Sequence, residues 1–210
     1  MHQICFRIRP LARRGVLLAT LALGSLMLMG CGDDDEVSNE RDARNAYLGL
    51  DAAVDRMLQL GFDGFNAASS ANIPEQQGDG DLSGTMAVNG QVDQGNSNNK
   101  GMRLDVSLTD YSDGPVEFED EDPVDITYNT STPIDADLSF KGLPDADMTG
   151  TIVGTVQMTG DLLGDVTLNL SVTGLTEDDG TGLIQRAAGT VRVTGTATSE
   201  FGVYDVDVTR

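Results

Sequence analysis

The segment Val166-Thr167-Leu168-Asn169-Leu170-Ser171-Val172 alternates apolar and polar residues without interruption. A period of two predicts a β-strand with one face buried and one face in water. The same period recurs between residues 81 and 209, in runs with the following apolar positions: Leu82, Met86, Val88 and Val92; Met102, Leu104, Val106 and Leu108; Val116 and Phe118; Val124, Ile126 and Tyr128; Ile134, Ala136, Leu138 and Phe140; Ile152, Val156 and Met158; Val191, Val193 and Ala197; Tyr204, Val206 and Val208.

Turn-forming segments separate these runs. They are rich in Gly, Asp, Asn and Pro, and they lie at residues 94–101, 113–115, 142–145, 160–161 and 177–180. Because strands joined by short loops tend to pair as antiparallel hairpins, we expect a meander of about eight strands. Glycines inside several runs indicate bulges or bends, as a strongly curved sheet would need.

The segment 39–62 has the period of a helix. Its apolar residues recur at steps of three and four: Ala43, Tyr47, Leu50, Val54, Met57, Leu58 and Phe62. Such a stripe predicts one amphipathic helix with its charged residues on the surface. Ser38 or Asn39 can cap its start, and Gly61 and Gly64 can end it. We expect the stripe to cover the core rather than to bind a partner.

The helix stripe and the single dry face of the sheet can cover each other. The predicted fold class is therefore mainly β: a curved antiparallel sheet or open barrel of about eight meandering strands packed on one N-terminal helix. Closure of the sheet on itself, as a barrel or a sandwich, is the alternative. Residues 39–210 are expected to form a single domain, with a helix over 39–62, a loop over 63–80 and a β-rich region over 81–209.

The first 30 residues differ in composition from the rest. Four arginines and no acidic residue occupy positions 1–14, and an apolar run follows over residues 15–30. This run is shorter than the roughly 20 residues that span a bilayer. A positive start and a short apolar run are typical of a secretory signal peptide, which we place at residues 1–30.

The apolar run ends in Leu28-Met29-Gly30-Cys31 and is followed by Gly32-Asp33-Asp34-Asp35-Glu36. The first four residues resemble the lipobox of bacterial lipoproteins. This resemblance implies cleavage before Cys31, acylation of Cys31 with fatty acids such as palmitate, and attachment to a membrane of the cell envelope. Since Gly32 stands where an Asp favours retention in the inner membrane, the outer membrane is the expected location. Residues 31–38 are expected to form an extended acidic tether.

Charge and residue types exclude many functions. Residues 1–30 hold four of the 13 basic residues and none of the 34 acidic ones, so residues 31–210 have a formal charge of −25. Such a surface does not suit nucleic acid, and it is repelled by anionic lipid. The only histidine is His2, and the two cysteines are Cys5 and Cys31. The mature chain would therefore lack the residues of Ser-His-Asp, Cys-His and zinc chemistry, and we expect no enzyme.

Two ligand hypotheses remain. Oxygen ligands suit calcium, and the densest acidic segment offers Asp113, Glu117, Glu119, Asp120, Glu121, Asp122 and Asp125, with the turn Gln77-Gly78-Asp79-Gly80-Asp81 as a weaker second candidate. A hydrophobic ligand could also lie between helix and sheet, lined by Met57, Met86, Met102, Met148 and Met158. The expected function is thus a lipid-anchored structural or binding protein without a cofactor. The alternatives are a carrier or sensor of a hydrophobic ligand and a calcium-dependent adhesion module.

Overall fold

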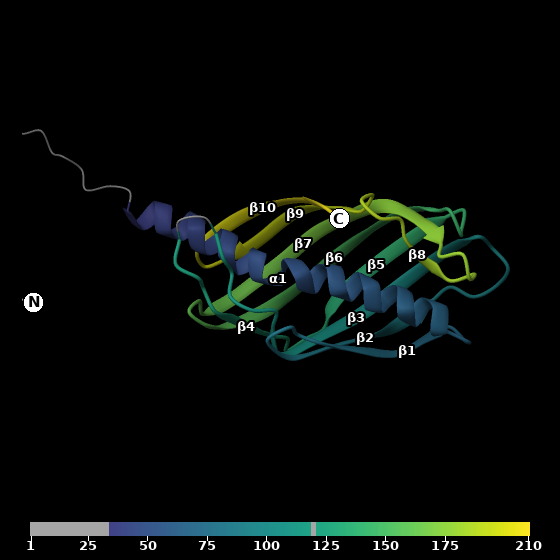
Figure 1. Cartoon of the computed structure of the whole chain (residues 1–210), viewed down its shortest axis with the longest axis horizontal. Coiled ribbons are helices and arrows are strands. Elements are labelled where there is room, and N and C mark those ends of the chain that lie inside the picture. The colour runs from purple at the N-terminus through teal and green to yellow at the C-terminus, as the bar shows by residue number, and fades with distance from the viewer. Residues whose placement is uncertain (1–33, 119–120) are drawn as a thin grey trace, which may run out of the picture. The chain divides into compact units, whose positions relative to one another are not determined.

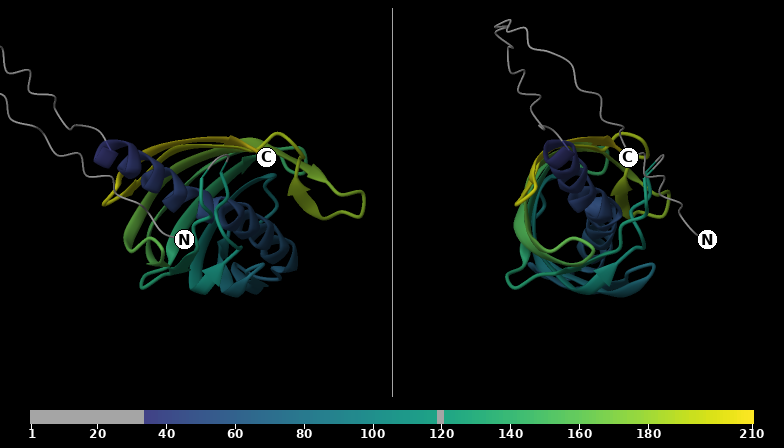
Figure 2. Two further views of the ribbon diagram at one scale, coloured as in Figure 1. Left: turned by 60° about the vertical axis from the view of Figure 1, so that its left-hand side comes forward. Right: turned by 90° about the vertical axis from the view of Figure 1, so that its left-hand side faces the viewer.

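A computed structural model describes residues 34–118 and 121–210, with side chains from Asn39 onward. One helix, α1 (Asp34–Ala67), lies across the concave side of one curved sheet (Figures 1 and 2). The strands are β1 (Asn72–Asp79), β2 (Ser83–Val92), β3 (Asn99–Ser112), β4 (Ile126–Asn129), β5 (Ile134–Lys141), β6 (Asp147–Gly160), β7 (Gly164–Asp178), β8 (Ile184–Arg186), β9 (Arg192–Ser199) and β10 (Gly202–Thr209).

The sheet is an antiparallel meander. Its order is β1-β2-β3-β4-β6-β7-β9-β10, and both β4 and β5 pair with β3 on one side and β6 on the other. These two short strands therefore follow one another in a single position, while β8 pairs only with β7. The ten strands occupy eight positions along the sheet and one side hairpin. The predicted fold class, a curved antiparallel sheet on one N-terminal helix, is confirmed.

The alternating residues form the core. In β7, Val166, Leu168, Leu170 and Val172 are buried while their neighbours are exposed. The seven apolar residues of the predicted helix stripe are at most 3% exposed. Each fully buried large apolar side chain contributes about 1.5–3 kcal/mol, so helix and sheet stabilise each other through one shared core.

Helix α1 is longer than the predicted 39–62. Residues 34–38, expected as an extended tether, form its first helical residues. At the other end, Gly61 and Gly64 do not end the helix but lie within it. A Cβ at Gly61 would come within 2.5 Å of Leu104, and one at Gly64 would overlap Ile73, so both glycines permit close approach to the sheet.

The predicted loop 63–80 contains β1, a strand that the sequence pattern missed. Ile73 is the only residue of β1 that is buried, and the pairing with β2 shifts between Ile73 and Gln76 around Pro74. Pro and an irregular register are typical of an edge strand. Two expected core residues are exposed instead: Leu82 at 63%, in the turn before β2, and Phe118 at 50%, in a segment where Val116 and Val124 form only an isolated bridge.

Candidate functional site

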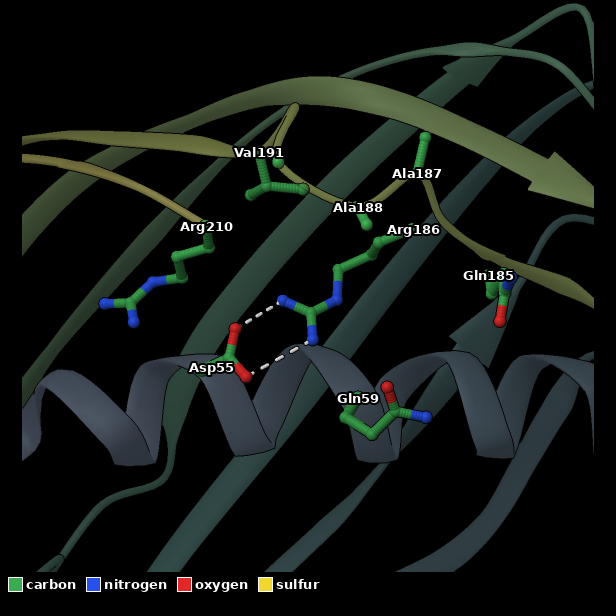
Figure 3. Close-up of a pocket in the computed structure, with 9 residues that line it drawn as sticks. Asp55, Gln59, Gln185, Arg186, Ala187, Ala188, Val191 and Arg210 are labelled. Carbon is green, nitrogen blue, oxygen red and sulfur yellow. Dashed lines mark hydrogen bonds and ion pairs between the residues drawn. The ribbon is translucent and has the colours of Figure 1, made fainter.

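One hollow lies between α1 and the chain around β8. It measures about 450 Å³ and is lined by Asp55, Gln59, Gln185, Arg186, Ala187, Ala188, Gly189, Val191 and Arg210 (Figure 3). Its walls come from the exposed flank of the helix and from the segment that leads from β8 into β9. The small residues 187–189 leave the hollow open beside the guanidinium groups. We call it the α1–β8 cleft.

One ion pair crosses this cleft, and a second lies beside it. Arg186 donates to Asp55, with 2.6 Å between Nη1 and Oδ1 and 3.4 Å between Nη2 and Oδ2 (Figure 3). One turn earlier in the helix, Asp51 accepts a hydrogen bond from Arg210. Hydrogen bonds from Arg186 hold the pKa of the Asp55 carboxyl below its usual range. A general acid needs a raised pKa, so Asp55 does not suit that role. The two ion pairs suit a clamp that holds α1 to the sheet.

Among the residues that the structure describes, two buried donors beside this clamp make no hydrogen bond within the usual distance and angle limits. They are the hydroxyl of Tyr47 and Nε of Arg210. Burial, with a contribution from Asp51, raises the pKa of the Tyr47 hydroxyl, which therefore stays protonated. The Tyr47 ring stacks on Tyr204 of β10 at 5.7 Å between centroids. This region closes the gap between α1 and the end strand of the sheet.

The other flank of the helix is held in the same way. Arg56 donates to the carbonyl oxygen of Asp79 at 2.5 Å and to the carboxylate of Asp81 at 2.7 Å. It also lies 3.4 Å from Asp113, which accepts a hydrogen bond from the hydroxyl of Tyr111. Asp79 and Asp81 belong to the weaker calcium candidate, and here they serve as partners of an arginine.

The acidic segment 113–125 is spread out rather than gathered. Asp113 faces Arg56 and Tyr111, whereas Glu121 pairs with Arg44 at 2.5 Å. The backbone N–H of Asp125 donates to Asp161, so its chain is tied to the β6–β7 turn. Glu117 and Asp122 are exposed, and Glu119 and Asp120 lie outside the described residues. Within the described ranges, no group of three or more acidic, His or Cys side chains is placed to hold a metal ion.

The five candidate lining methionines belong to the packed core. Met57, Met86, Met102, Met148 and Met158 are at most 2% exposed and lie in one continuous apolar cluster. None of them lines the α1–β8 cleft. None of them lines another hollow, between the start of α1 and Val203 of β10. They fill space between helix and sheet, as the flexible side chain of methionine allows.

The sequence did not single out Arg186 and Arg210. The composition contained a signal for them. Residues 31–210 contain few basic residues and 34 acidic ones, so each arginine can be expected to have an acidic partner. All seven arginines with described side chains form an ion pair: Arg41, Arg44, Arg56, Arg103, Arg186, Arg192 and Arg210. Four of these arginines form the five ion pairs that join α1 to other parts of the described chain. The helical residues Arg44, Asp51, Asp55 and Arg56, expected as plain surface charges, are contacts instead.

Comparison of the chain with protein-family models, with curated proteins and with solved structures finds no match. Among the described residues, no helix is both long and apolar enough to cross a membrane. The predicted lipid attachment at Cys31 lies outside the described residues.

Proposed function

We propose that this protein is a lipid-anchored protein of the bacterial cell envelope, attached through Cys31, with a structural or binding role. The observation that carries the proposal is the arginine-rich start, the short apolar run and Leu28-Met29-Gly30-Cys31, followed at once by polar residues. Anchoring by several acyl chains is stable, whereas a single chain binds only marginally. Gly32 favours the outer membrane as the location.

The packing and ion pairs of α1 support its role as a rigid connection between such an anchor and the sheet. Only Gly32 and Asp33 separate Cys31 from the first residue of the helix. The helix packs through its stripe, and ion pairs hold both of its flanks. A force applied at the lipid would thus reach the sheet through a helix fixed at many points.

The cleft chemistry supports a role without catalysis. Asp55 is held ionised by Arg186 rather than poised to donate a proton. Two arginines and two aspartates balance the charge of the clamp, so it offers no excess charge to a substrate ion. The packed methionines give less support to the carrier alternative, and the spread acidic segment gives less support to the calcium alternative.

Metabolic labelling with a palmitate analogue tests the proposal. The wild type should incorporate the label and float with outer-membrane fractions, and an inhibitor of the lipoprotein signal peptidase should accumulate the uncleaved precursor. Cys31→Ala should abolish the label and release the chain from membranes. Cys5→Ala is the matched control and should change neither. Label retained by Cys31→Ala, or equal membrane association without it, would refute the proposal.

A further inference from the structure

Several segments meet where α1 enters the sheet, an end that we call the N-terminal rim. Arg44 of the helix lies 4.0 Å above the ring of Phe118 and bonds to Glu121. Two hydrogen bonds of 2.9 Å join Asp125 to Asp161 in the β6–β7 turn. Val203 and Tyr204 of β10 share a hollow of about 410 Å³ with Glu40, Arg41, Arg44 and Glu121. The first turns of α1 project past this end (Figure 1).

Three large apolar side chains at the rim are exposed, although burial of apolar surface is favourable. Phe118 is 50% exposed, Leu163 in the β6–β7 turn is 60% exposed, and Val203 at the start of β10 is 60% exposed. Single exposed apolar residues are ordinary. These three, however, come from three different segments that the contacts above bring to the same end.

The chain length places this rim near the proposed anchor. Three residue steps from Cys31 to Asp34 span at most about 10 Å. Nine helical residues from Asp34 to the buried Ala43 add about 14 Å. The opposite end of the sheet is farther away, because the 15 residues of β7, which lie between Leu163 and Leu183, measure about 45–50 Å along the strand. Of these two ends, the rim is the one that a lipid on Cys31 holds beside the bilayer.

The negative charge of the N-terminal rim indicates which kind of bilayer surface the rim can contact. The described residues of the rim include the acidic Glu117, Glu121, Asp122, Asp125, Asp161 and Glu200. Only Arg41 and Arg44 oppose them there, and both are already paired. Anionic lipids repel such a surface, whereas zwitterionic headgroups do not.

We propose that the N-terminal rim rests on a zwitterionic phospholipid surface, with Phe118, Leu163 and Val203 entering the interface beside the anchor. This inference rests on the proposed lipidation of Cys31. It fixes the orientation of the domain: the β7–β8 hairpin points away from the membrane, and the convex face of the sheet stands upright and remains accessible to partners.

Single-tryptophan variants test the orientation, because the chain contains no tryptophan. Phe118→Trp and Leu163→Trp probe the rim, and Leu183→Trp, at a side chain 49% exposed on the opposite end, is the matched control. The full lipidated chain is reconstituted into phosphatidylcholine vesicles with or without brominated acyl chains. Bromine should reduce rim emission about twofold, since interfacial side chains reach the boundary between headgroups and acyl chains. The emission of Leu183→Trp should not change.

Flotation of the same vesicles separates this inference from the proposed function. If the protein floats but bromine leaves both rim tryptophans unquenched, or quenches Leu183→Trp equally, the orientation is refuted while the anchor stands. Rim tryptophans shielded from water yet unquenched would mean that protein covers the rim, which also refutes it. Weaker quenching in vesicles rich in anionic lipid is the expected effect of the acidic rim, and stronger quenching there would contradict the choice of lipid. A chain that does not float refutes the anchor itself.

Discussion

Replacement of Gly49 by alanine tests the close approach of α1 to the sheet. Gly49 lies over the ring of Tyr128, and an added Cβ would overlap the phenol oxygen and come within 3.0 Å of Cζ. The Tyr128 side chain is 1% exposed, and its hydroxyl donates to the carbonyl oxygen of Ala46 at 3.0 Å. Neither the ring nor the helix has free space beside it, so one of them must move.

The expected sign is opposite to that of helix propensity. In an exposed helix, replacement of Gly by Ala stabilises by about 1 kcal/mol. Overpacking a core costs about 1–3 kcal/mol, and loss of the buried hydrogen bond of Tyr128 costs about 1 kcal/mol more. We therefore expect Gly49→Ala to lower the free energy of unfolding by about 2 kcal/mol.

Urea unfolding followed by circular dichroism measures this change at constant m-value. Ala52→Gly, at an exposed position of the same helix, is the control for propensity and should cost about 1 kcal/mol. In the Tyr128→Phe background, where the clashing oxygen is absent, Gly49→Ala should cost at least about 1 kcal/mol less. A stabilised Gly49→Ala protein, or the same cost in both backgrounds, would refute the packing described for α1 and Tyr128.

Three further predictions concern the ion pairs and the buried hydroxyls. Arg186→Met keeps the aliphatic length but removes the pair with Asp55, and should cost about 1 kcal/mol in urea unfolding at neutral pH; an unchanged midpoint would mean that the clamp contributes nothing. Because Arg186 lowers the pKa of Asp55, this contribution is present above the unfolded-state pKa of about 4 and is lost as pH falls through the lower folded value. Asp55→Asn should therefore lose less stability than the wild type between about pH 5 and pH 2, and superimposable acid limbs would contradict this. Burial raises the pKa of Tyr128, so its contribution is present below about pH 10 and lost at higher pH; its ionisation, followed by ultraviolet difference absorption, should coincide with alkaline unfolding, and a normal titration in the folded state would show that Tyr128 is not buried.

The fold class was predictable because its signals are periodic. Alternation such as that of Val166 to Val172 fixes which face of a strand is buried, and the stripe from Ala43 to Phe62 does the same for the helix. Both patterns depend only on local sequence and on the burial of apolar surface. They predicted one helix, a meandering sheet and the shared core between them.

The remaining features depend on contacts between distant residues. Gly64 resembles a helix end in the sequence, yet it serves the approach of α1 to Ile73 of β1. The strand β1 itself has no alternation, because an edge strand with one buried residue needs none. The α1–β8 cleft joins Asp55 to Arg186 across 131 positions of the chain, and no spacing rule predicts such a pair.

The intact mass of the mature protein tests the central proposal most directly. Extracted from membranes in mild detergent and analysed by mass spectrometry, the chain should begin at Cys31 and carry a diacylglycerol thioether and an amide-linked acyl chain. Its N-terminal peptide should yield the modified Cys31 followed by Gly32. A mature chain that begins elsewhere, or one that begins at Cys31 with a free thiol, would contradict the lipid anchor on which the proposed function rests.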